Sequence, residues 1–178
     1  MNNIFLIRHA QSFKNLDPKN YNGGLTPNGI KQCVVLHKNL YKNYLFQPNI
    51  HLVSSPFLRC IETARYVFPS LEINIESDLR EEPSSCPQSE HWIDNICYRP
   101  ETKQDFLNRI SKFYNRYCLG EDTDLIVVTH GTVIDCLLAN IHSNITEIPE
   151  WNHLLPNCSL TIVSNNRLIT KGLYFGVV

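Results

Sequence analysis

Short apolar runs alternate along this chain with segments whose apolar residues recur at helical spacing, and this alternation limits the fold more than any other feature. The runs at 4–7, 50–54 and 125–128 are the right length for buried strands and too short for core helices. A helical pattern follows each run, directly or after a loop, which is typical of a parallel sheet. We therefore expect a single α/β domain over residues 1–178, with a mostly parallel central sheet flanked by helices in three layers.

Four helices are predicted around these strands. Thr26-Pro27 is a favourable helix start, because Thr caps the first turn and Pro fits the first helical position. The predicted helices begin at Thr26, at Ser55-Pro56, near Glu101 and at Gly131. The rest is expected to form a loop at 10–24, an edge strand at 71–75 and a hairpin at 159–170 that turns at Asn165-Asn166.

Residues 80–100 interrupt this order. They contain three prolines, two cysteines and no helical or strand periodicity. Loops of this length inside a compact domain usually carry function. We expect a long loop that lies over the functional site.

The composition excludes several classes of protein. With 16 Lys and Arg against 17 Asp and Glu, the net charge of −1 is too low for a protein that works mainly on nucleic-acid phosphates. No apolar run reaches the ~18–20 residues of a membrane helix. The chain start lacks the basic region of a signal peptide. Seven scattered cysteines without a Cys-x-x-Cys pair are typical of reduced thiols, so we expect a cytoplasmic protein without metal or cofactor.

Basic side chains gather at the predicted carboxyl ends of the strands. Arg8 and His9 end the first strand, Arg59 lies in the first turn of the helix after the second, and His130 follows the run at 125–128. Ligands of open α/β sheets bind beyond these ends. One arginine side chain can bind two phosphate oxygens at once, and the N-terminus of a helix offers further N–H donors to an anion. Each residue alone would more often be structural, but together they predict a site for a dianion such as phosphate.

Five sequence blocks match, in order, the pattern of one enzyme superfamily. They are Leu6-Ile7-Arg8-His9-Ala10-Gln11-Ser12-Phe13-Lys14-Asn15, Gly24-Leu25-Thr26-Pro27-Asn28-Gly29, Ser54-Ser55-Pro56-Phe57-Leu58-Arg59-Cys60-Ile61-Glu62-Thr63-Ala64, Leu79-Arg80-Glu81 and Val127-Val128-Thr129-His130-Gly131. Together they resemble the histidine phosphatase superfamily, also called phosphoglycerate-mutase-like, over nearly the whole chain. Ala10, Gln11 and Thr132 depart from the pattern, which commonly has glycine, glutamate and glycine there. Ala10 places a methyl group beside the expected phosphate path.

The resemblance implies the chemistry of the site. His9 is expected to be the nucleophile, whose neutral imidazole takes the phosphoryl group and forms phosphohistidine. Arg8, Arg59 and His130 resemble the phosphate clamp, which neutralises the phosphoryl oxygens in the transition state.

Further residues complete the expected site. Asn15 stands where the superfamily places a donor to the phosphate, and Gly131 is expected to bind substrate at the start of a helix. Glu81 resembles the general acid that protonates the leaving oxygen. Glu82 is its adjacent competitor, and the leucine-x-glutamate spacing favours Glu81.

The resulting hypothesis is a metal-independent phosphatase, a phosphoric monoester hydrolase that acts on a small phosphorylated substrate. Residues 82–98 do not resemble the acid loop of the mutases, and this favours a phosphatase. A phosphoglycerate mutase and a phosphohistidine protein phosphatase remain as alternatives. A catalytically inactive module that binds a phosphorylated ligand is disfavoured, because candidates for nucleophile, clamp and acid are all present.

Overall fold

A six-stranded sheet forms the centre of the protein in its computed structural model, which describes residues 3–44, 50–81, 91–93, 96–98, 101–118, 123–142, 155–165 and 167–176. The strand order is β3-β2-β6-β1-β7-β8. The strands are β1 (Asn3–Arg8), β2 (His51–Ser54), β3 (Ile73–Ile75), β6 (Leu125–Thr129), β7 (Leu160–Ser164) and β8 (Arg167–Leu173). Neighbours among β3, β2, β6 and β1 are parallel, whereas β7 is antiparallel to β1 and β8. The predicted mostly parallel sheet is confirmed.

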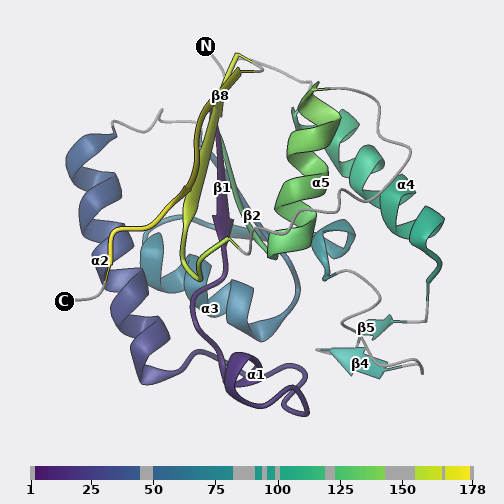
Figure 1. The fold of residues 1–178 in the computed structure, drawn as a ribbon, viewed down its shortest axis with the longest axis horizontal. Helices are drawn as coiled ribbons and strands as arrows, with labels where there is room; N and C mark the ends of the chain where they lie inside the picture. The colour runs from purple at the N-terminus through teal and green to yellow at the C-terminus, as the bar shows by residue number, and fades with distance from the viewer. Residues whose placement is uncertain are drawn as a thin grey trace.

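Helices cover both faces of this sheet (Figure 1). On one side lie α2 (Pro27–Asn43) and α3 (Leu58–Val67), and on the other α4 (Lys103–Phe113) and α5 (Gly131–His142). A π-helical turn at Tyr114–Cys118 extends α4. The expected three layers of a single α/β domain are therefore present.

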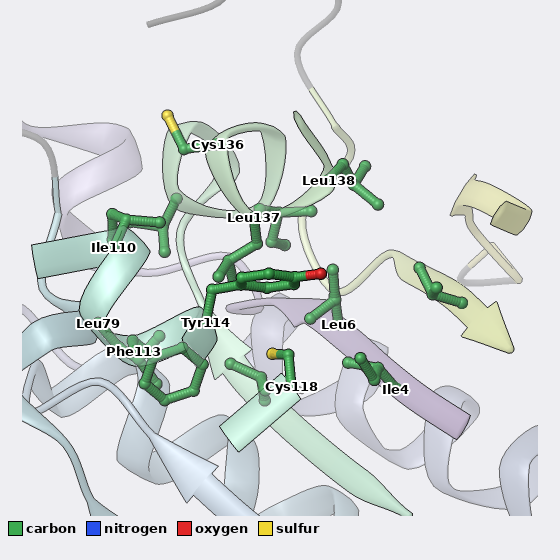
Figure 2. Packing of buried hydrophobic residues seen from close by; sticks show 14 of the residues in the cluster. Ile4, Leu6, Leu79, Ile110, Phe113, Tyr114, Cys118, Cys136, Leu137 and Leu138 are labelled. Atoms are coloured by element: carbon green, nitrogen blue, oxygen red, sulfur yellow. The ribbon is translucent and has the colours of Figure 1, made fainter. Parts of the chain in front are cut away.

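Two apolar clusters bind the layers together, because successive side chains of a strand point to opposite faces. Phe5 packs in the cluster under α2 and α3, whereas Ile4 and Leu6 pack in the cluster under α4 and α5. Figure 2 shows the second cluster, in which Leu6 lies among side chains such as Ile110 of α4 and Leu137 of α5. Burial on both faces explains why the strands read as continuous apolar runs.

The first turn of α2 requires a glycine at position 29, because the backbone of Gln11 packs directly against it. Thr26 caps α2 as predicted, because its Oγ1 accepts a hydrogen bond from the Gly29 backbone N–H over 3.0 Å. A Cβ atom on residue 29 would lie 2.0 Å from the carbonyl oxygen of Gln11. The segment after β1 is thus held directly against the first turn of α2.

Two expectations about local structure were wrong. The loop expected at 10–24 contains a short helix, α1 (Phe13–Leu16), which a capping box between Ser12 and Asn15 supports. The second helix begins at Leu58 rather than at Ser55. Ser55 does not cap it, because its N–H donates to the Val128 carbonyl and its hydroxyl binds a histidine.

The segment 80–100 is only partly a loop in the structure. A 3-10 turn (Ser77–Leu79) leads into it, and β4 (His91–Ile93) pairs with β5 (Ile96–Tyr98) in an antiparallel two-stranded sheet. Residues 82–90, 94–95 and 99–100 lie outside the described residues.

Three parallel strands end side by side and so define one edge of the sheet. Arg8 of β1 pairs with Thr129 of β6, and Ser54 of β2 pairs with Val128 of β6. The short helix α1 follows at the end toward which β1 points (Figure 1). None of the helices in the described ranges is both long and apolar enough to cross a bilayer.

Candidate active site

Two imidazole rings lie next to each other at this edge. His9 and His130 are 3% and 1% exposed, and their ring centroids are 5.3 Å apart. Nδ1 of His9 lies 2.9 Å from the carbonyl oxygen of Ala10. A carbonyl oxygen only accepts hydrogen bonds, so Nδ1 carries the hydrogen and the lone pair lies on Nε2.

Both imidazoles are neutral because their surroundings oppose a positive charge. Burial lowers the pKa of His9 well below its usual 6.5, and the positive charges of Arg59 and Arg8 lower it further. Burial lowers the pKa of His130 in the same way, with Arg59 as the next cause. Nε2 of His9 therefore keeps its lone pair at neutral pH.

His130 is oriented by contacts with Arg59 and Ser55, and Sγ of Cys60 lies 3.6 Å from its Nε2. Its Nδ1 lies 3.4 Å from Nη2 of Arg59, and its Nε2 lies 2.9 Å from Oγ of Ser55. A guanidinium group only donates, so Nδ1 accepts and Nε2–H donates to Ser55. The hydroxyl of Ser55 thus fixes the ring against Arg59.

Two arginines border the histidines and keep hydrogen-bond donors available. Arg59 is completely buried and donates through Nη1 to the Tyr21 carbonyl oxygen over 3.1 Å. Arg8 donates through Nη1 to the Leu155 carbonyl oxygen. The Nε atoms of both arginines are buried and have no hydrogen-bond partner among the described residues. Buried donors of this kind are costly unless an anion binds them, so they favour an anion site.

Glu81 brings a carboxylate to the same place. Its Oε2 accepts from Nη2 of Arg59 over 2.5 Å and from Nζ of Lys14 over 2.7 Å. Glu81 is therefore in contact with Arg59 and Lys14, and its role as the acid stays a prediction. Glu82 lies outside the described residues.

The backbone around Glu81 is held by side chains from two other elements. The carbonyl oxygens of residues 78–81 all accept hydrogen bonds. Arg109 of α4 donates to the first, third and fourth over 2.7, 2.9 and 3.0 Å, and Thr129 Oγ1 donates to the second over 2.8 Å. Glu101 in turn binds Arg109 over distances down to 2.5 Å. The position of Glu81 thus depends on the packing of α4.

Asn15 lies at the border of the site. Its Oδ1 accepts from the backbone N–H and the hydroxyl of Ser12, over 2.9 and 3.0 Å. Nδ2 of Asn157 lies 3.5 Å from the same oxygen and donates to the His9 carbonyl oxygen over 3.1 Å. Asn157 therefore connects Asn15 with the backbone of the histidine.

Two further positions lie close to the clamp. A Cβ atom on Gly131 would be 3.8 Å from Nε of Arg8, so this glycine lies beside the guanidinium group. Ala10 is fully buried, and its N–H donates to Oγ1 of Thr63 over 3.0 Å. The methyl group of Ala10 is accommodated inside the core.

The structure thus brings together His9, His130, Arg8, Arg59 and Glu81, with Asn15 and Gly131 beside them. Lys14 and Arg109 were not predicted as site residues from the sequence. Lys14 lies inside the first motif block, next to Asn15, and that position was the available signal. Arg109 had no local signal, because it is one polar residue of a predicted helix. No three His, Cys, Asp or Glu side chains in the described part of the chain are grouped so that they could hold a metal ion.

A parallel sheet with two neutral histidines, a buried arginine, a half-buried arginine and a carboxylate gathered at the carboxyl ends of its strands defines an α/β protein suited to bind a phosphoryl group. The chain belongs to the histidine phosphatase superfamily (branch 1), whose family model matches residues 4–167. The sequence resemblance is thereby confirmed.

Solved structures with this fold cover nearly the whole chain. The phosphoserine phosphatase of Entamoeba histolytica, in complex with 3-phosphoglyceric acid, matches with a TM-score of 0.73 and 18% identity over 100% of both chains. The alpha-ribazole phosphatase of Shigella flexneri matches with a TM-score of 0.71 and 22% identity over 99% of both chains. A mycobacterial glucosyl-3-phosphoglycerate phosphatase matches with a TM-score of 0.67 and 20% identity over 92% of this chain and 93% of that one. A search of curated proteins found no match.

Proposed function

We propose that this protein is a phosphatase that hydrolyses small phosphomonoesters through a phosphohistidine on His9. The observation that carries the proposal is the hydrogen bond from Nδ1–H of His9 to the Ala10 carbonyl oxygen, in a ring whose pKa is lowered. It leaves the lone pair on Nε2, beside Arg8 and Arg59. A neutral nitrogen held next to paired cations has the properties of a phosphoryl acceptor.

In the first step, Nε2 of His9 forms a bond to phosphorus while the bond from phosphorus to the ester oxygen breaks. Arg8 and Arg59 donate hydrogen bonds to the phosphoryl oxygens, and the charge they neutralise is greatest in the transition state. Glu81 gives a proton to the leaving oxygen, so that an alcohol departs rather than an alkoxide.

In the second step, water attacks phosphorus and the bond to Nε2 breaks. The ionised carboxylate of Glu81 takes a proton from this water, which returns both residues to their starting states. The hydrogen bond from Nδ1 to the Ala10 carbonyl oxygen persists through both steps and keeps the ring oriented.

The remaining predicted residues support these steps. His130 orients Arg59, with which it shares a contact of 3.4 Å. Asn15 and Gly131 bind the phosphate from the border of the site. The predicted loop of residues 80–100 over the site lies partly outside the described residues and stays a prediction. The structural neighbours named above support this assignment, because they are a phosphoserine phosphatase, a glucosyl-3-phosphoglycerate phosphatase and an alpha-ribazole phosphatase.

The phosphohistidine is tested with His9→Ala, and the exposed His51 provides the matched control His51→Ala. Wild type and His51→Ala are expected to hydrolyse p-nitrophenyl phosphate and to carry acid-labile, base-stable phosphate during turnover. His9→Ala should lose both, and a metal chelator should leave the wild-type rate unchanged. Full activity of His9→Ala would overturn the mechanism. Conversion of 3-phosphoglycerate into its 2-phospho isomer would instead assign a mutase.

The acid is tested by comparing Glu81→Gln with Glu82→Gln. Glu81→Gln should lower turnover by roughly 10²–10⁴ on esters with alkoxide-type leaving groups. The loss should be much smaller on p-nitrophenyl phosphate, whose leaving group needs little protonation. Glu82→Gln should match wild type on both substrates. The reverse pattern would move the acid to Glu82.

A further inference from the structure

The ammonium group of Lys14 lies inside the proposed active site, although Lys14 has no role in the proposed reaction steps. Its Nζ is 2.7 Å from Oε2 of Glu81, and its side chain is only 14% exposed. It also lies 5.0 Å from the ring centroid of Tyr21, so an aromatic face supports it. A lysine that is mostly buried and held by a carboxylate and a ring occupies a defined position.

This position is next to the phosphate clamp. Nζ of Lys14 and Nη2 of Arg59 both donate to the same oxygen of Glu81, over 2.7 and 2.5 Å. The distance between the two nitrogens therefore cannot exceed the sum of these two hydrogen-bond lengths. Burial and Arg59 lower the pKa values of His9 and His130 most, and Lys14 adds to the lowering of both. Its charge therefore acts at the point where the phosphoryl group is transferred.

Positive charge exceeds negative charge among the described side chains at the site. Of these, three cations, Arg8, Arg59 and Lys14, stand against the carboxylate of Glu81, and both histidines are neutral, which leaves two positive charges. A phosphate dianion balances these two. In the proposed first step Glu81 carries a proton, so one positive charge then remains uncompensated.

The described charges behind Glu81 compensate one another. Arg80 and Arg109 pair with Glu101, and Arg116 pairs with Glu76 and with Asp78, whose charge also acts on Arg109. The excess of positive charge among the described residues therefore lies at Arg8, Arg59 and Lys14. Because complementary charge determines which ligand such a site prefers, a substrate with another negative charge fits better than a simple phosphomonoester.

We propose that Lys14 binds a second anionic group of the substrate, a carboxylate placed one or two carbon atoms from the phosphorylated oxygen. This inference rests on the proposed function and specifies its substrate class. A phosphate bound to Arg59 places such a carboxylate within reach of Nζ. Lys14 then exchanges the carboxylate of Glu81 for that of the substrate, and Glu81 becomes available to the leaving oxygen. Lys14 is thus a specificity-determining residue.

The experiment uses pairs of compounds that differ only in the carboxylate: O-phosphoserine with O-phosphoethanolamine, and 3-phosphoglycerate with glycerol 3-phosphate. Dissociation constants are measured by calorimetry in His9→Ala, which does not consume the ligands. The carboxylate member of at least one pair should bind about tenfold more tightly, as expected for one hydrogen bond between charged groups. Adding Lys14→Gln should reduce the ratio to about one, whereas Lys14→Arg should keep most of it. The exposed Lys19 provides the matched control Lys19→Gln, which should change nothing.

Each other result overturns the proposal. An equal loss for both members of a pair would place Lys14 in the phosphate clamp, and no loss at all would make it a partner of Glu81 alone. The same holds if neither carboxylate compound binds more tightly than its partner, or if neither binds. Hydrolysis of p-nitrophenyl phosphate by wild type, dependent on His9, shows separately whether the proposed function stands.

Discussion

The guanidinium group of Arg109 donates a hydrogen bond to the backbone carbonyl oxygen of Glu81 over 3.0 Å. Arg59 binds the side chain of the same residue over 2.5 Å. The backbone of Glu81 is thus held by an arginine of α4, and its carboxylate is held by an arginine of α3. The geometry of the proposed acid therefore depends on an arginine that would not itself touch the substrate.

Replacing Arg109 should weaken acid catalysis without touching the nucleophile. Arg109→Gln is expected to lower kcat by about tenfold or more on esters with poor leaving groups, since misplacing a reacting group by about 1 Å costs up to 10²-fold. The effect should be much smaller on p-nitrophenyl phosphate. In a Glu81→Gln background the same change should have little further effect, because Arg109 acts through Glu81.

A purely structural role of Arg109 would give a different result. Breaking its buried pair with Glu101 costs about 3–5 kcal/mol of folding stability, so the assays are run well below the melting temperature of the variant. Loss of stability alone would reduce the rates on all substrates equally. Arg116→Gln is the control, because Arg116 is an exposed arginine of the turn after α4 and pairs with Glu76. It should leave the dependence on leaving group unchanged.

Arg59 should be irreplaceable by lysine. Arg59→Ala is expected to lose about 3–4 kcal/mol of transition-state stabilisation, measured from kcat/KM, as is usual when fixed donors to a developing charge are removed. Arg59→Lys should restore only part of this, because a lysine lacks the planar fork that reaches Glu81, the Tyr21 carbonyl oxygen and a phosphate together.

The control for Arg59 lies on the same helix. Arg65 is exposed on α3, and Arg65→Lys should have no effect on kcat/KM. A wild-type rate in Arg59→Lys would show that the fork geometry is not needed and that a point charge suffices. A phosphate analogue such as vanadate should compete with substrate in wild type and bind weakly to Arg59→Ala.

The sequence predicted the parts of this site that depend on strand ends. Arg8 and His130 follow apolar runs that only a buried strand explains, so the parallel arrangement brought them together without further information. Lys14 and Arg109 were not predicted, because their importance comes from contacts across 67 and 28 positions of the chain to Glu81. Contacts of that length follow from tertiary packing and leave no periodic signal.

Local structure was mispredicted where a side chain is used by a distant residue. Ser55-Pro56 has the sequence of a helix start, yet the hydroxyl of Ser55 lies 2.9 Å from Nε2 of His130. The serine therefore serves the site, and the helix begins at Leu58, whose N–H donates to the side chain of Asn22 over 2.9 Å. A propensity for capping was overridden by a hydrogen bond across 75 positions.

Gly29→Ala should destabilise the fold although it lies in a helix, where alanine is normally favoured. The new Cβ would meet the Gln11 carbonyl oxygen at 2.0 Å, and backbone must move to accept it. Overpacking of this kind costs about 1–3 kcal/mol or more of the free energy of unfolding, measured with urea. Lys31→Ala, at an exposed position of the same helix, is the control and should be neutral or slightly stabilising. A stable Gly29→Ala would mean that the two segments are not in close contact.

The stability of the protein should fall as the pH drops below about 6.5, the ordinary pKa of histidine in an unfolded chain. The folded state holds the pKa values of His9 and His130 well below that value, mainly through burial and then through Arg59. In the range between the two pKa values, the unfolded chain binds protons at these positions and the folded chain does not. Protonation therefore favours unfolding, and the stabilisation is fully present only above the unfolded pKa.

Each of the two histidines should contribute up to about 1.4 kcal/mol per pH unit to this loss. The free energy of unfolding is measured with urea at several pH values between about 7.5 and 5, above the range in which carboxylates titrate. His9→Gln removes one of the two groups. Its free energy of unfolding should therefore depend less steeply on pH than that of wild type, by the contribution of one proton, up to about 1.4 kcal/mol per pH unit. This difference in slope does not depend on the absolute stability of the variant. Equal slopes for the two proteins would mean that His9 takes up a proton in the folded state, and a protonated ring could not attack phosphorus. The slope therefore tests, without any substrate, the neutral state of His9 on which the proposed chemistry depends.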